Sequence, residues 1–142
     1  MTRASTGPGV PPAEITATLR IEGLVVFAAA IASYAALGGN WWLFAVLLLS
    51  PDLAMLGALR GPVFGARLYN LAHTYTLPAL LAGLAWATGA AWLLPLAVIW
   101  FAHIGMDRAA GYGLKYPGLD HHTHLGLIGK GKRKAAQLAN AS

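Results

Sequence analysis

The chain has 142 residues, of which 57% are hydrophobic and 11% are charged, and its mean hydropathy is +0.57. Because a water-soluble domain carries roughly 25% charged residues, this composition excludes an ordinary soluble fold and predicts an integral membrane protein. The sequence holds no cysteine, which excludes disulfides, thiolate metal sites and cysteine nucleophiles. The net charge of +5 is carried largely by the C-terminal segment. Beside membrane helices, we interpret it as a topology signal and a contact with membrane lipid, not as a nucleic-acid surface.

Four apolar runs follow one another along the chain, at residues 19–37, 41–59, 66–88 and 91–110. Each is close to the roughly 20 residues that a helix needs to span the hydrocarbon core. The connections between them are short, so neighbouring helices are expected to run antiparallel. We therefore predict an all-α, integral membrane fold: an up-down-up-down four-helix bundle with a C-terminal lid loop in residues 18–127. Disordered segments are expected at 1–17 and 128–142.

The distribution of positive charge predicts the orientation. Lysine and arginine are absent from the connections at 38–40 and 88–90, whereas Arg60, Arg67 and the basic C-terminal segment belong to the opposite end. Cytoplasmic loops carry an excess of these residues. Both termini are therefore expected in the cytoplasm.

Several polar groups lie inside the predicted spans, where an ionisable residue costs about 2.5–3.5 kcal/mol on insertion scales and marks a functional site by default. They are Glu22 in the first run, Asp52 in the second, Asn70 and His73 in the third, and His103 and Asp107 in the fourth. With a rise of about 1.5 Å per residue, all of them fall in the cytoplasmic half. His103 and Asp107 are four residues apart and share one helix face.

Histidine and carboxylate ligands from several helices of a bundle are a common way to build a metal site. We therefore expect Asp52, His73, His103 and Asp107 to hold a divalent metal. Without thiolates the ligand set suits zinc, iron or manganese and does not choose among them. Structural explanations stand beside this one: Asp52 begins a helix, the histidines bridge helices, and Asp107 pairs with a neighbouring cation.

The segment after the fourth run carries Lys115 and three histidines, His121, His122 and His124. It emerges beneath the polar cluster and could fold back over it as a lid. We expect Lys115 to bind an anionic group, and His124 or Glu22 to act as a general base. The alternatives are a solvated loop with inert histidines and a Glu22 that pairs with Arg20.

Seven motifs carry a family resemblance. They are L-R-I-E-G at 19–23, G-G-N-W-W-L-F at 38–44, P-D-L-A-M-L-G at 51–57, Y-N-L-A-H-T-Y at 69–75, H-I-G-M-D-R at 103–108, G-Y-G-L-K-Y-P at 111–117 and T-H-L-G at 123–126. The sequence resembles a small bacterial family of four-helix membrane proteins, catalogued as a domain of unknown function (the four-two-six-zero family). The resemblance implies the bacterial cytoplasmic membrane. It favours Glu22, Asp52, His73, His103, Asp107, Lys115 and His124 as shared positions and leaves His121 and His122 outside the pattern.

The expected function is that of a metal-dependent hydrolase acting on a lipidic or amphipathic substrate at the cytoplasmic leaflet. One alternative is a redox protein that binds haem or quinone, with His73 and His103 as an axial pair. A second is a non-catalytic scaffold or carrier, whose buried charges pair with one another. Gly57, Gly61 and Gly65 would permit close helix contact in a homo-oligomer.

Overall fold

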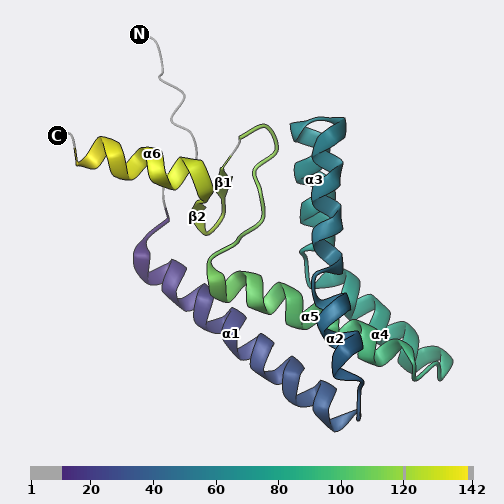
Figure 1. Ribbon diagram of the computed structural model, residues 1–142. Helices are drawn as coiled ribbons and strands as arrows, with labels where there is room; N and C mark the ends of the chain where they lie inside the picture. Colours follow the sequence, from purple (N-terminus) through teal and green to yellow (C-terminus); the bar gives the residue numbers. More distant parts are fainter. Residues whose placement is uncertain (1–10, 120, 141–142) are drawn as a thin grey trace.

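The computed structural model describes residues 11–119 and 121–140, whose regular elements are helices and one short hairpin (Figure 1). In chain order the elements are α1 (Ala13–Ala36), α2 (Trp41–Leu48), the 3₁₀ helix η1 (Ser50–Arg60), α3 (Pro62–Ala72), α4 (Thr76–Thr88), α5 (Leu93–Ala110), β1 (His122–Thr123), β2 (Gly126–Leu127) and α6 (Gly129–Ala139). The all-α prediction is confirmed.

Within the described residues, three stretches are long and apolar enough to cross a membrane: Ala13–Ala36, Trp41–Arg60 and Leu93–Ala110. Large apolar side chains on their surfaces face outward, for example Trp42, which is 83% exposed, and Leu59, which is 87% exposed. Lipid is the environment in which such a surface is stable. The chain is therefore a membrane protein.

The third apolar run differs from the expected single helix. It forms two shorter helices, α3 and α4, separated by residues 73–75. In Figure 1, α3 stands beside η1, whereas α4 lies along α5. An uninterrupted third span is therefore not formed, and the up-down-up-down four-helix bundle is not confirmed.

Donors from α5 stabilise this break. Backbone carbonyls released where a helix ends must be paired if they are away from water. The indole N–H of Trp100 donates to the carbonyl of Ala72 at 2.7 Å, and the guanidinium of Arg108 donates to that of His73 at 2.9 Å. Both donors lie far along the sequence, whereas the local contribution comes from Pro78, which has no N–H to bond the carbonyl of Thr74.

Close backbone contact joins α1 to α5. A Cβ atom added at Gly105 would lie 2.7 Å from the backbone nitrogen of Phe27 and 2.8 Å from the carbonyl oxygen of Gly23, closer than real Cβ atoms approach. Farther along the same pair of helices, the buried core includes Tyr34 and Ile99. Glycine at the crossing therefore brings the two long helices together and fixes the position of α5.

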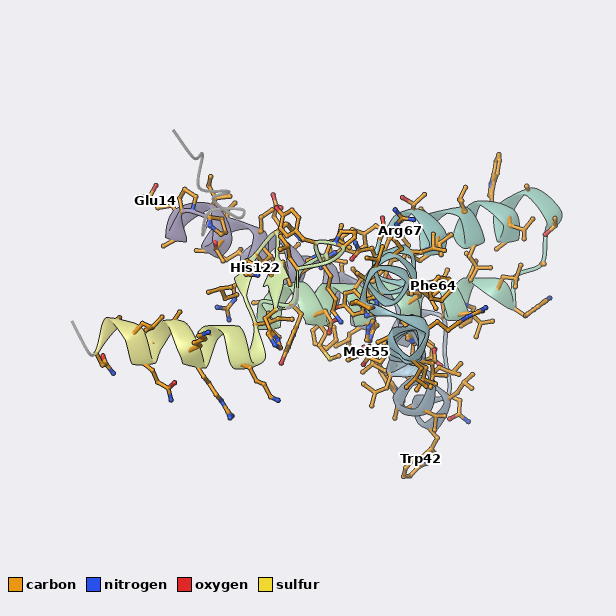
Figure 2. All side chains as sticks on the ribbon, turned by 90° about the horizontal axis from the view of Figure 1, so that it is seen from above. Glu14, Trp42, Met55, Phe64, Arg67 and His122 are labelled. Carbon is orange, nitrogen blue, oxygen red and sulfur yellow. The ribbon has the colours of Figure 1, made fainter. Side chains whose placement is uncertain are left out.

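The pair of η1 and α3 is also packed through glycine. A Cβ at Gly65 would lie 2.6 Å from the Cα of Ala58, and one at Gly57 would lie 2.8 Å from the side chain of Leu68. Figure 2 looks down this pair, with Met55 on η1 and Phe64 on α3. Gly57 and Gly65 thus serve a contact within the chain, whereas a Cβ at Gly61 would meet nothing within 4 Å.

The two ends of the chain also differ from expectation. We expected a disordered segment at 128–142, but its described part forms α6. At the other end α1 begins at Ala13, inside the segment 1–17 that was expected to be disordered. The remaining expectations for residues 1–10 and 141–142 lie outside the described residues.

Candidate metal centre

Three separate elements supply the four expected ligands. Asp52 lies in the first turn of η1, directly after a proline that favours a helix start. His73 is the residue that follows the last turn of α3. His103 and Asp107 lie one turn apart on α5. Because α3 ends at His73, the side chain of His73 reaches His103 on α5. Donors from the same helix α5 bond the backbone carbonyls of Ala72 and His73.

The structure brings these four side chains together. One ligand atom from each lies within 4.8 Å of the others. The Nε2 atoms of His73 and His103 are 3.0 Å apart. Asp52 Oδ1 lies 3.4 and 3.6 Å from these two nitrogens, and Asp107 Oδ2 lies 3.5 and 3.7 Å from them. A tetrahedral ion with bonds of about 2.0–2.1 Å holds its ligand atoms about 3.3–3.4 Å apart, so these five separations are close to those of one four-coordinate site.

Burial is uneven across the cluster. The side chains of His73 and His103 are fully buried, that of Asp107 is 14% exposed and that of Asp52 is 40% exposed. The cluster is therefore closed on the histidine side and open at Asp52. A water molecule or a substrate group would enter from there.

Tyr69 holds His73 in place. Its ring stacks on the imidazole, with centroids 3.7 Å apart and planes 16° apart, and its hydroxyl donates to Asp107 Oδ2 at 3.4 Å. The backbone carbonyl of Tyr69 accepts a hydrogen bond from His73 Nδ1 at 2.8 Å. With the proton on Nδ1, the lone pair of Nε2 faces the cluster. A backbone carbonyl behind the imidazole is the usual support of a metal-bound histidine.

The second histidine has a different environment. Nδ1 of His103 is buried, and no hydrogen-bond partner meets it within the described structure. Two imidazole Nε2 atoms 3.0 Å apart repel each other unless a proton or a cation lies between them. A cation would accept both lone pairs. A shared proton would join the two rings by a hydrogen bond and leave Nδ1 of His103 as a buried acceptor.

The expected lid loop is attached to α3 next to the cluster. The side-chain amide of Asn70 donates to the carbonyl of Lys115 at 2.7 Å and accepts from its N–H at 2.7 Å. These two hydrogen bonds resemble those between paired strands. The ammonium of Lys115 lies over the ring of Tyr69, 4.1 Å from its centroid. A positive charge thus lies one aromatic ring away from His73.

Glu22 and His124 line one cavity, and the four ligands are not among its described lining. This cavity has a volume of about 450 Å³ and is also lined by Tyr75 and Arg108. Nδ1 of His124 accepts a hydrogen bond from the N–H of Leu114 at 2.8 Å. Burial, together with the positive charge of Arg108, lowers the pKa of His124 below its ordinary value.

Sequence reasoning missed Tyr69, Trp100 and Arg108, which support the cluster. A signal existed for two of them. Tyr69 precedes His73 by four residues, the spacing of neighbours on one helix face, and Arg108 is an arginine inside an apolar run. Trp100 carried no such signal, because tryptophan is common in membrane helices.

An all-α membrane protein with a His/Asp cluster between its helices is the class that this fold and this site define. The family described as Domain of unknown function (DUF4260) matches residues 16–128 of the chain. The chain belongs to this family, which confirms the resemblance seen in its motifs. No curated protein and no solved structure matches it.

Proposed function

We propose that the chain is a membrane-embedded hydrolase that uses one divalent metal ion, held by Asp52, His73, His103 and Asp107. The observation that carries the proposal is that four donor atoms from three elements lie within 4.8 Å of one another. Two carboxylates that approach each other in an apolar setting repel, and a cation offsets that repulsion. Nitrogen and oxygen ligands suit zinc, iron or manganese.

The open side of the cluster supports catalysis over a purely structural role. A structural metal site is closed by four protein ligands, whereas a catalytic one keeps a position for water; with Asp52, His73, His103 and Asp107 all bound, water would take a fifth position on the exposed Asp52 side. A bound divalent ion lowers the pKa of a coordinated water and polarises the scissile bond. Asp52, at 40% exposure, lies where water and a substrate ester would meet. Hydrolysis then joins the water oxygen to the acyl or phosphoryl centre, and the leaving alcohol takes the proton.

The surrounding residues suggest the substrate class. The ammonium of Lys115, held over Tyr69, would attract an anionic group, and the apolar outer surface suits a lipidic or amphipathic molecule. Glu22 and His124 line the other cavity, so we assign the general-base role to neither of them. The charge pattern supports a location in the bacterial cytoplasmic membrane, with both termini and the cluster on the cytoplasmic side.

A proton carrier without metal is the second candidate. The 3.0 Å separation of the two Nε2 atoms is also a hydrogen-bonding distance, and a carboxylate lies on either side of the pair. The haem alternative is less well supported. Axial histidines lie on opposite faces of the macrocycle, and the space between nitrogens 3.0 Å apart does not admit one.

The test is turnover by the purified full chain. Protein in detergent, loaded in turn with zinc, manganese or ferrous iron, is assayed on amphiphilic carboxylic and phosphate esters. Loss of a hydrogen-bond partner behind a metal ligand lowers the activity of a metal enzyme by about 10–100-fold. Asp52→Asn and His103→Ala, which change ligands themselves, should lower the turnover rate by more than this. The matched control is His121→Ala, an exposed loop histidine outside the cluster. Absence of turnover with every metal, or an equal loss in the control, would contradict the proposal.

A further inference from the structure

The most spacious of the cavities described lies away from the metal cluster. It has a volume of about 760 Å³ and is bounded by the start of α1, the end of α5, the β1–β2 hairpin and α6. Figure 1 shows α6 at the same end of the molecule as the beginning of α1. Because α1 is one of the stretches able to cross a membrane, this cavity lies at the end of a span.

The charge of the cavity has one sign. Among the described residues that line it, the charged ones are Arg20 on α1 and Lys132 on α6, and both are cationic. The Nε–H group of Arg20 donates to the carbonyl of Ala109 at 2.9 Å, which fixes the guanidinium at the wall of the cavity. A guanidinium and an ammonium facing one space are suited to a phosphate group.

Most of the remaining wall is apolar, apart from the hydroxyl-bearing Thr16 and Tyr112. Leu125, Leu127 and Ile128 contribute from the hairpin, and alanines contribute from α1 and α5. Leu125 is only 6% exposed and forms a fixed part of this wall. A ligand that complements both the cationic and the apolar residues of this wall has a negatively charged headgroup and an apolar chain.

The arrangement of α6 separates this site from the general basic surface. Lys132 and Ala135, three residues apart, face the cavity, whereas Lys130, Arg133 and Lys134 are not among its lining residues. At 100° per residue these three share another face of the helix. In Figure 2, α6 extends away from the body, with side chains on more than one side.

We propose that this cavity binds one anionic phospholipid, with its phosphate between Arg20 and Lys132 and the start of its acyl chains against Leu125 and Ile128. The bound lipid joins α6 to the ends of α1 and α5. This site does not depend on the metal centre.

The test measures the binding of a fluorescent phosphatidylglycerol to the purified full chain in non-ionic detergent. Lys132→Gln should weaken binding by about 10–100-fold, the value of a hydrogen bond to a charged group. The matched control Lys134→Gln removes the same charge from the same helix and should change affinity less than about twofold, because salt screens distant charges. Phosphatidylcholine with the same chains should bind at least tenfold more weakly, and inorganic phosphate should not displace the lipid.

Arg20 requires a further comparison, because Arg20→Gln also removes its bond to the end of α5. Arg20→Lys keeps the charge and loses that bond, so it should retain lipid binding where Arg20→Gln does not. Equal effects of Lys132→Gln and Lys134→Gln would show a diffuse basic surface and overturn the proposal. Displacement by phosphate would identify a site for free anions, and equal binding of phosphatidylcholine would show that the headgroup is not recognised.

Discussion

Removal of metal should destabilise the chain, and the cluster allows the size of the effect to be worked out. A ligand that binds the native state alone adds RT ln(1 + [L]/Kd), which is about 2.7 kcal/mol at a hundredfold excess over Kd. The four ligands come from η1, the end of α3 and α5. No single element supplies them all, so the unfolded chain binds the ion weakly and most of this stabilisation belongs to the fold.

The assay is a thermal melt in detergent, with and without a strong chelator. A domain of this size shifts its Tm by roughly 3–5 °C per kcal/mol, so the chelator should lower the Tm of the wild type by about 10 °C. His103→Ala removes a fully buried ligand. This variant should have a low Tm in both conditions, and the chelator should change that Tm little. His121→Ala, the control outside the cluster, should respond as the wild type does.

The competing explanation gives a different pattern. If the two Nε2 atoms share a proton instead of a metal ion, the chelator changes no melting temperature, although His103→Ala still destabilises the fold by breaking the hydrogen bond between the rings. Equal chelator responses in the wild type and His103→Ala, including no response in either, would refute the reasoning and favour the site without metal.

Three further predictions concern the fold. Gly105→Ala should lower the free energy of unfolding by about 1–3 kcal/mol, because the added methyl group overpacks against α1. Gly83→Ala adds a Cβ that meets nothing within 4 Å, so it should raise the free energy of unfolding by about 0.5–1 kcal/mol. Chemical denaturation measures both. The lowered pKa of His124 means that its neutral form stabilises the loop above the unfolded value of about 6.5. The protection of amides at residues 112–118, corrected for the pH dependence of the intrinsic exchange rate, should therefore decrease as pH falls below it. Cysteines at positions 39 and 89 should react with an impermeant reagent in intact cells.

Each of these has a decisive contrary result. Equal stability of the two alanine variants would show that α1 and α5 are not in close contact at Gly105. His124→Gln does not titrate, so the same pH dependence of exchange in this variant would remove His124 as the cause. Labelling of a cysteine at position 142 in intact cells, with none at 39 or 89, would invert the orientation.

The meeting of the four candidate ligands could be predicted because lipid makes polar residues conspicuous. A histidine and an aspartate four residues apart in an apolar run, with Asp52 and His73 at a similar depth, leave few arrangements that keep them out of lipid. The positions of Glu22 and His124 are harder to predict. Depth along a helix does not determine which face of the bundle a side chain lines, and both residues line a different cavity.

The break between α3 and α4 has one local signal, Pro78, which lacks the N–H that would bond the carbonyl of Thr74. Because membrane helices tolerate proline, this signal alone does not distinguish a kinked helix from two separate helices. The break is stabilised by Trp100 and Arg108, which lie 28 and 35 residues beyond the carbonyls that they pair. The helix α6 was missed for a related reason, because a lysine-rich segment resembles a disordered tail until its alanines and Leu138 are placed on one face.

The metal content of the purified chain tests the central claim most directly. Protein stripped of metal and dialysed against cobalt should bind one ion per chain and show the intense visible absorption of a four-coordinate site with nitrogen and oxygen ligands. His121→Ala should give the same spectrum, and His103→Ala should lose it. Substoichiometric cobalt in the wild type, or the same spectrum in His103→Ala, would contradict a metal centre at Asp52, His73, His103 and Asp107.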